Sequence, residues 1–205
     1  MDTSVLATSF SVDLPAWVPD ELADWPESLP TLDDRMRLVN RLASRNPAEG
    51  NGGPFAAIVT ERESGRIVSV GVNVVLASGL SSAHAEVVAL SLAQTRLGSW
   101  DLGAADRPAL DLINNWRPCL QCLGSTMWSG VQRLVVAGSG PECEDLTRFD
   151  EGPVRDDWAE QFEARGIEVV DGVRRAEAVE VFAEYGRRVG AGAATVYNAR
   201  GTGPR

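Results

Sequence analysis

The chain has 205 residues, 44% of them hydrophobic, which is enough to bury the core of one domain with appended terminal segments. Its formal net charge of −10 argues against nucleic acid as a partner, because a surface that neutralises phosphates is rich in Lys and Arg. No apolar run approaches the ~18 residues of a membrane-spanning helix, and the N-terminus lacks a basic and then apolar signal segment, so we expect a cytoplasmic protein.

The predicted elements alternate between helices and strands. Residues 1–30 contain Pro15, Pro19, Pro26 and Pro30 and predict an irregular arm that packs through Trp17 and Trp25. In the body, 31–189, a helix is predicted from Thr31 to before Pro47, followed by strands at 54–60 and 67–76. A helix at 83–97, capped by Ser81 or Ser82, leads to a strand at 110–113, a helix from Pro118 and a strand at 134–137. Helices at 156–165 and 174–187 follow, with a strand at 167–170 between them. A glycine-rich tail, 190–205, follows. This alternation indicates a three-layer α/β domain.

Three side chains have the types and the spacing of zinc ligands. Cys119 and Cys122 are three positions apart at a predicted helix start, so they share one face, and the helix N-terminus favours thiolate. His84, the only histidine, stands at the start of another predicted helix. We therefore expect two helix N-termini to face each other across one Zn²⁺ held by these three residues.

Glu86 is predicted to carry protons at this metal. Residues two apart on a helix point to different sides, but in the first turn His84 and Glu86 can converge on a point beyond the helix end. Three protein ligands leave one zinc position open for water, whose pKa falls from about 15.7 toward about 7. The resulting hydroxide would attack an amidine-type carbon, while Glu86 passes the proton to a ring nitrogen and then to departing ammonia.

Each half of this pattern has ordinary alternatives. A lone Cys-x-x-Cys is often half of a structural zinc site or a redox pair, and a lone His-x-Glu has little meaning. Combined in this order, with Pro118 before the first cysteine, they match the signature of zinc-dependent deaminases. A structural zinc site is the alternative. Cys143, the remaining cysteine, lies in a polar stretch and has no predicted role.

The chain resembles the cytidine deaminase superfamily, and within it the bacterial guanine deaminases. The resemblance covers residues 31–200 and is carried by Asn73 and by the segments 52–57, 83–87, 118–122 with Gly124, 128–131, 149–153 and 196–198. The last two segments, Phe149-Asp150-Glu151-Gly152-Pro153 and Val196-Tyr197-Asn198, are specific to this branch.

The resemblance implies a cytidine-deaminase-like α/β/α fold with a mixed five-stranded sheet, in a homodimer that exchanges C-terminal tails. It also implies how a nucleobase is held. Asn73 would bind the carbonyl or ring edge of the base, and Ala85, next to His84, would also contact the substrate. Glu151 would contact the substrate and share in proton transfer. Tyr197 from the partner's tail would close the pocket. The implied reaction converts guanine to xanthine and ammonia.

One segment departs from the branch, which usually has a Thr-Ser pair, a variable residue and then Glu-Pro-Cys. Here the stretch is Asn114-Asn115-Trp116-Arg117-Pro118-Cys119, so Arg117 replaces a glutamate and the local charge changes from −1 to +1. We favour an interpretation in which Arg117 pairs with an acidic residue. Alternatively, Arg117 or Trp116 reaches the pocket and binds the substrate, which would redirect specificity.

Guanine deamination is therefore the leading function. Its nearest alternative is the same chemistry on cytosine, cytidine, guanosine or an aminotriazine. Deamination of adenosine in tRNA is disfavoured by the net charge. A zinc-stabilised binding module without catalysis is the non-enzymatic alternative.

Overall fold

The computed structural model describes residues 3–201, which contain a five-stranded sheet in the order β2-β1-β3-β4-β5. The strands are β1 (Ala56–Glu61), β2 (Ile67–Val72), β3 (Leu110–Asn114), β4 (Arg133–Val136) and β5 (Glu168–Val170). β1 pairs antiparallel with β2 and with β3, whereas β3 with β4 and β4 with β5 are parallel pairs. The sheet is mixed, which confirms the implication of the resemblance.

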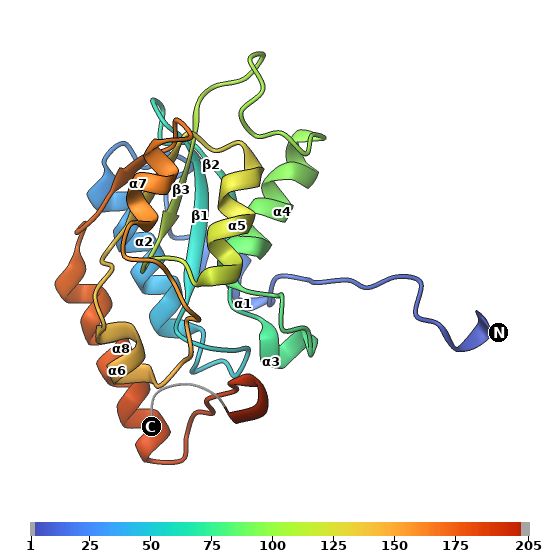
Figure 1. Cartoon of the computed structure of the whole chain (residues 1–205), viewed down its shortest axis with the longest axis vertical. Coiled ribbons are helices and arrows are strands. Elements are labelled where there is room, and N and C mark those ends of the chain that lie inside the picture. Colours follow the sequence, from blue (N-terminus) through green and yellow to red (C-terminus); the bar gives the residue numbers. More distant parts are fainter. Residues whose placement is uncertain (1–2, 202–205) are drawn as a thin grey trace.

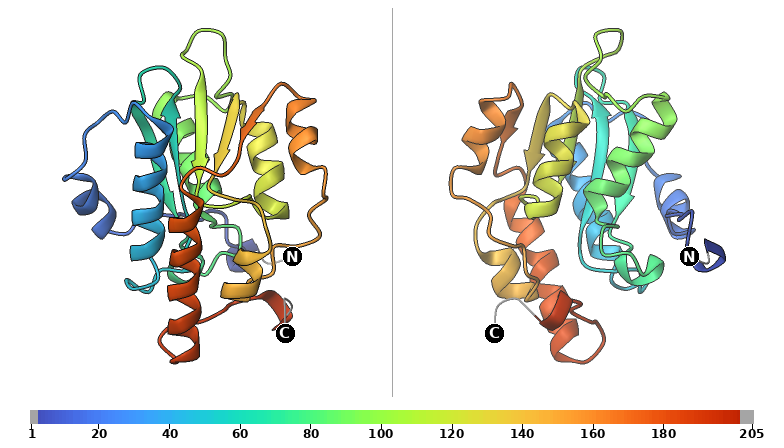
Figure 2. Two further views of the ribbon diagram at one scale, coloured as in Figure 1. Left: turned by 90° about the vertical axis from the view of Figure 1, so that its left-hand side faces the viewer. Right: turned by 45° about the vertical axis from the view of Figure 1, so that its right-hand side comes forward.

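Helices cover both faces of this sheet (Figure 1, Figure 2). α2 (Leu32–Arg45) and α8 (Arg175–Gly190) lie on one face. On the other face lie α4 (Ala85–Leu97), α5 (Leu120–Ser129) and α7 (Trp158–Glu163). β1 and β3 are buried along their whole length because both of their faces are covered. The predicted three-layer architecture is confirmed. No helix in residues 3–201 is long and apolar enough to cross a membrane.

α2 shows how local sequence sets a helix start and a buried face. The Thr31 hydroxyl accepts a hydrogen bond from the Asp34 N–H at 3.0 Å, which satisfies one of the free N–H groups of the first turn. Met36, Val39 and Leu42 recur at helical spacing and are fully buried against the sheet. Burial of each such side chain contributes about 1.5–3 kcal/mol.

α4 packs closely on the sheet because the facing residues are small. A Cβ atom on Gly71 of β2 would lie 2.2 Å from the Ala85 oxygen and 2.5 Å from the Ala89 nitrogen, so no larger residue fits there. Ala85, Ala89 and Ala93 are fully buried on this side of the helix. This contact fixes the N-terminus of α4, and therefore the start of the predicted site, at one end of the sheet.

The N-terminal region is less irregular than predicted, since it contains α1 (Trp17–Leu22). Trp17 is buried in the core, Trp25 packs against the same cluster, and the guanidinium groups of Arg45 and Arg37 lie over their rings at 4.9 and 5.4 Å. The region therefore packs on the body through its tryptophans. Val12 and Leu14 also pack against this cluster, whereas the exposed start of the described chain runs outward from the body (Figure 1).

Local structure differs from the predictions at two places and adds elements that were not predicted. The strand predicted at 67–76 ends at Val72, and α3 (Val75–Ser78) follows it. The N-cap residue of α4 is His84 rather than Ser81 or Ser82. α6 (Glu142–Thr147) was not predicted and buries Cys143 completely. Within the tail a short 3-10 helix spans Ala199–Gly201, and residues 202–205 lie outside the described part. Helices of four to six residues carry too little periodicity to be recognised in a sequence.

Candidate metal centre and active site

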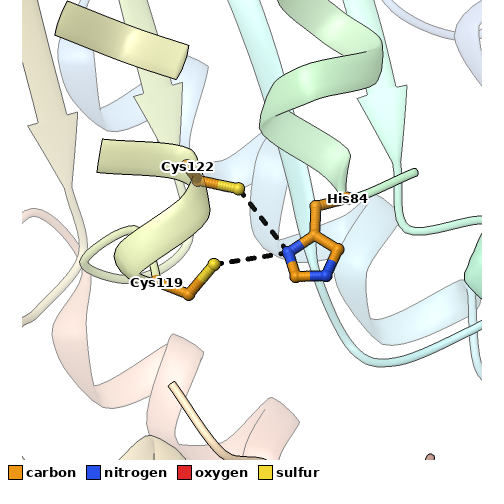
Figure 3. A group of neighbouring side chains, drawn as sticks. All are labelled: His84, Cys119 and Cys122. Carbon is orange, nitrogen blue, oxygen red and sulfur yellow. Dashed lines mark hydrogen bonds between the residues drawn. The ribbon is translucent and has the colours of Figure 1, made fainter. Parts of the chain in front are cut away.

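Two helix N-termini bring the three predicted metal ligands together. His84 is the N-cap residue of α4, Cys119 is the N-cap residue of α5, and Cys122 lies in the first turn of α5. Nδ1 of His84 lies 3.4 Å from Sγ of Cys119 and 3.5 Å from Sγ of Cys122 (Figure 3). The three ligand atoms all lie within 4.8 Å of one another. The two helix starts converge as predicted, and the three side chains form a group that could hold a metal ion.

These atoms fit a tetrahedral zinc ion. A tetrahedral zinc ion has bonds of about 2.3 Å to sulfur and about 2.0–2.1 Å to nitrogen. A sulfur and a nitrogen bound to the same ion are therefore about 3.5 Å apart. The observed separations are 3.4 and 3.5 Å. Two thiolates and an imidazole form a donor set typical of zinc, and three protein ligands leave a fourth position for water or substrate. The residues present therefore fit a catalytic zinc site.

The electrostatics of the three ligands favour metal binding. A hydrogen bond from Cys122, with His84 nearby, lowers the pKa of the Cys119 thiol to about 4 in spite of burial. Burial lowers the pKa of His84, but the hydrogen bond and charge of Cys119 outweigh it and raise that pKa to about 9. The pKa of Cys122 is raised because it donates to Cys119 and is buried. Zinc binding therefore releases protons from His84 and Cys122, so zinc affinity should increase with pH.

Glu86, the second residue of α4, lies in the same site as the ligands. Its Oε1 accepts a hydrogen bond from Nδ2 of Asn114 at 2.9 Å. Burial raises the pKa of Glu86, and the negative charge of Cys119 raises it further. A carboxylate whose pKa is raised is a stronger base than an ordinary glutamate, as a proton carrier requires. Its position matches the role predicted for it.

A cavity of about 220 Å³ connects Glu86 and the metal ligands to the surface. This volume is below the ~300–1,000 Å³ typical of pockets for drug-sized ligands, so it suits a single small heterocycle. All predicted site residues except Ala85 and Cys122 line it. The full lining is Phe55, Asn73, Val75, Ser81, His84, Glu86, Asn114, Trp116, Arg117, Cys119, Phe149, Asp150, Glu151, Tyr197, Asn198 and Ala199.

Asn73 follows directly after β2 and is held in one orientation. Its Oδ1 accepts hydrogen bonds from the Val75 N–H at 3.2 Å and from the Tyr197 hydroxyl at 2.7 Å. Because a backbone N–H can only donate, the atom facing it must be the amide oxygen. The NH₂ group of Asn73 is therefore the part of this side chain available to a ligand.

Tyr197 lines the cavity and contacts residues on two sides of it. Its hydroxyl donates to Asn73 and accepts from the Gly53 N–H at 2.8 Å, and its ring lies 4.8 Å from that of Phe149. Burial raises the pKa of Tyr197, so the phenol keeps its proton. The described part is a single chain, and exchange of tails between subunits stays a prediction.

Glu151 is a buried acid on the cavity wall. Burial, followed by the negative charges of Cys119 and Glu86, raises its pKa to about 8, while the positive charge of Arg117 acts in the opposite direction. Arg117 is half-buried on the same wall, and its backbone N–H donates to the Gly138 oxygen at 2.7 Å. Within residues 3–201 Arg117 forms no salt bridge, so the expected pairing with an acidic residue is not formed.

Trp116 is mainly a core residue. Its Nε1 donates to the Gly140 oxygen at 3.2 Å, its ring lies 5.1 Å from that of Phe182, and the Arg175 guanidinium lies over it at 4.9 Å. These contacts fix one orientation, in which Trp116 also lines the cavity. Ala85, by contrast, is buried against Gly71 and does not line the cavity.

Eight of the lining residues were not predicted as site residues, among them Phe55, Phe149 and Asn114. Phe55 and Phe149 form an aromatic wall, with ring centroids 5.5 Å apart, and both lie in segments that carried the family resemblance. Asn114 stands at the end of the fully buried strand β3, directly after the apolar Leu112 and Ile113, where an uncharged polar side chain is unusual. That contrast between residue type and position was the available signal.

Comparison with known proteins gives a consistent result. The model of the cytidine and deoxycytidylate deaminase zinc-binding region matches residues 30–138. A guanine deaminase of Bacillus subtilis is 29% identical over 110 residues, a match that covers 54% of this chain and 66% of that protein. A tRNA-specific adenosine deaminase of Buchnera aphidicola is 33% identical over 93 residues, covering 45% of this chain and 57% of that protein. The chain thus matches just under two thirds of the first of these relatives and less of the second.

Solved structures match over more of the chain. A guanine deaminase from Nitrosomonas europaea is 38% identical, with a TM-score of 0.82, covering 89% of this chain and 98% of that one. The protein NE0047, solved in complex with 2,6-diaminopurine, is 39% identical with a TM-score of 0.82, covering 94% of this chain and 98% of that one. The similarity therefore extends over nearly the whole of both chains.

Proposed function

The chain belongs to the zinc-binding family of cytidine and deoxycytidylate deaminases, and we propose that it deaminates free guanine to xanthine and ammonia. One observation supports this most strongly. Glu86 lies in one cavity with His84 and Cys119 of the zinc site, inside a fold that a guanine deaminase shares over 98% of its length. Hydrolytic deamination needs this combination of an activated water and a proton carrier.

The reaction replaces an exocyclic C–N bond by a C–O bond. Zinc held by His84, Cys119 and Cys122 supplies a Lewis acid that lowers the pKa of water. Glu86 takes a proton from the attacking water and gives it to the ring nitrogen next to the attacked carbon. It then transfers the second proton to the amine, which leaves as ammonia, so protons balance without another acid.

Substrate binding is assigned to the residues around Glu86. The NH₂ group of Asn73 offers a donor to a carbonyl or unprotonated ring nitrogen, since its oxygen is already used by Val75 and Tyr197. Phe55 and Phe149 provide an apolar wall for a flat ring. Glu151, with a pKa near 8, is protonated at neutral pH and can donate a hydrogen bond to the base. Ala85 can contribute only through its backbone, because its side chain is buried against β2.

Arg117 is the reason to test other substrates. Arg117 lines the cavity and has no salt-bridge partner in residues 3–201, so its guanidinium is not committed to an acid and could donate to a carbonyl oxygen of the substrate. Cytosine, cytidine, guanosine and aminotriazines are therefore the alternative substrates. The net charge of −10 disfavours tRNA, although one relative is a tRNA-specific adenosine deaminase.

We also propose a homodimer that acts in the cytoplasm. α5 carries two exposed apolar side chains, Trp128 with 84% and Leu120 with 51% of their surface accessible, and such residues on a helix next to the site suit an interface with a second copy. Thiolate ligands need a reducing compartment, which the cytoplasm provides. The tail, 190–205, is assigned to closure of the cavity through Tyr197.

Ammonia release from a panel of compounds tests this function. Purified protein with one zinc per chain is incubated with guanine, guanosine, cytosine, cytidine, an aminotriazine and a tRNA that carries a target adenosine. Guanine is expected to give the largest kcat/KM. If another compound releases ammonia and guanine does not, the substrate assignment is wrong. If none does, the enzymatic proposal gives way to a zinc-stabilised binding module.

A further inference from the structure

The Asn114 amide connects the proposed proton carrier to the loop that leads to a metal ligand. Its Nδ2 donates to Oε1 of Glu86 at 2.9 Å and to the backbone oxygen of Trp116 at 2.7 Å. Trp116 is three residues before Cys119. One NH₂ group therefore spans two of the segments that build the site.

The orientation of this amide is determined by its partners. The backbone oxygen of Trp116 can only accept a hydrogen bond, so the atom facing it must be the nitrogen. Both hydrogens of Nδ2 are then used, one for each partner. The backbone of Asn114 is also fixed, because it pairs with Ala57 of β1 on one side and Val136 of β4 on the other. Asn114 thus offers Glu86 a donor that cannot easily move.

The amide oxygen of Asn114, unlike its nitrogen, forms no hydrogen bond in the described residues. This oxygen is also buried. A buried acceptor without a partner is rare in folded proteins, and such exceptions concentrate at functional sites. An apolar residue would suit this position in β3 better, next to the fully buried Ile113 and Leu112. The hydrogen bonds of this side chain are therefore made through its nitrogen.

The neighbouring Asn115 shows the structural alternative. Its Oδ1 accepts from the Ala56 N–H at 3.0 Å and its Nδ2 donates to the Pro54 oxygen at 3.0 Å, so both ends of the amide are satisfied by backbone. It joins β3 to the segment that enters β1 and does not line the cavity. Two consecutive buried asparagines therefore have different environments, and only Asn114 reaches the active site.

We propose that Asn114 is a positioning residue that fixes the Glu86 carboxylate relative to the Cys119 loop. This inference rests on the proposed deaminase function. By holding Oε1, the amide leaves Oε2 of Glu86 to exchange protons with the water, the ring nitrogen and the leaving amine. The bacterial guanine deaminases that this chain resembles usually have threonine at this position. A threonine hydroxyl has one hydrogen, so it cannot donate to Glu86 and to the Trp116 oxygen at the same time.

The test compares Asn114→Ala with the matched control Asn115→Ala. Asn114→Ala should lower kcat about 10- to 100-fold, because small displacements of a catalytic group have effects of this size. Its KM should stay within about threefold and its zinc content at one per chain, since neither substrate nor metal contacts are removed. Asn115→Ala should lower thermal stability with kcat within about threefold of wild type. Asn114→Thr should recover part of the lost kcat.

A double-mutant cycle with Glu86→Asp separates positioning from general destabilisation. The shorter Asp side chain cannot reach the Asn114 amide, so adding Asn114→Ala to it should change kcat less than twofold. Independent, multiplicative effects would overturn the proposal, as would equal kcat losses in Asn114→Ala and Asn115→Ala. If Asn114→Ala does not fold, Asn114→Thr against Asn115→Thr makes the same comparison, and equal kcat values would overturn it. Failure of the deaminase function would instead appear as an inactive wild type.

Discussion

Replacing Tyr197 by phenylalanine isolates the contribution of one hydroxyl group to the active site. The ring that lies 4.8 Å from Phe149 is kept, while hydrogen bonds to Asn73 and from Gly53 are lost. Each such bond contributes about 0.5–1.5 kcal/mol, and the loss of both leaves the Gly53 N–H without this acceptor. We therefore expect the variant to be less stable by about 1–3 kcal/mol.

The effect on catalysis follows from Asn73. Without the Tyr197 hydroxyl, the Asn73 oxygen keeps only the longer bond from Val75, at 3.2 Å, and its NH₂ group is less well oriented toward the base. If about 1–2 kcal/mol of this interaction is lost in the transition state, kcat/KM for guanine falls about 5- to 30-fold. Steady-state ammonia release and thermal unfolding of Tyr197→Phe measure the two effects. Unchanged kcat/KM in a destabilised variant would refute the link between the tail and substrate binding.

The same residue tests whose tail closes the cavity. Subunits carrying Glu86→Gln and subunits carrying Tyr197→Ala are unfolded, mixed and refolded together. If the tail closes its own subunit through the contacts of Tyr197 with Asn73 and Gly53, hybrids stay inactive. If tails are exchanged, one site of each hybrid has both Glu86 and Tyr197, and activity reappears.

Three further predictions follow from other parts of the molecule. Removing metal with a chelator should abolish ammonia release, and added Zn²⁺ should restore it. Activity that survives complete metal removal would contradict a catalytic zinc site at His84, Cys119 and Cys122. Trp128→Glu should convert a dimer to monomers in sedimentation experiments, because a charge would then lie in the proposed interface; an unchanged dimer would place the interface elsewhere. Glu21, which joins α1 to α2 through Arg41 and Arg45 at 2.7 and 2.9 Å, has a pKa lowered to about 2, mainly by the hydrogen bond from Arg41. Glu21→Gln should therefore reduce the free energy of urea unfolding by about 1 kcal/mol at pH 7, and this difference should fade as pH falls from about 4.5 toward 2; a difference independent of pH would refute the ion pair.

The parts of the site that the sequence predicted well are those determined by local structure. His84, Cys119 and Cys122 each lie in or next to the first turn of a helix, and the helix start itself sets their direction. Residue type then restricts the chemistry, because a histidine and two cysteines near one acid suit few metals other than zinc. Glu86 was predictable for the same reason.

Other features depend on contacts between distant segments. Phe149 and Tyr197 meet only because α8 and the following loop return the chain to the cavity, and no local pattern encodes that return. The partner expected for Arg117 is likewise a tertiary property, and none of the acids in residues 3–201 forms a salt bridge with it. Cys143 illustrates the same limit, since a polar sequence around it gave no indication that α6 buries it.

The central claim is that Glu86 transfers protons at a zinc site, and Glu86→Gln tests it most directly. Glutamine keeps the size of the side chain but cannot carry a proton between water, ring and amine. The variant should bind one zinc per chain and fold as the wild type does, while ammonia release from guanine falls by about 10²–10⁴-fold. Turnover at the wild-type rate, in protein with its zinc retained, would contradict the mechanism.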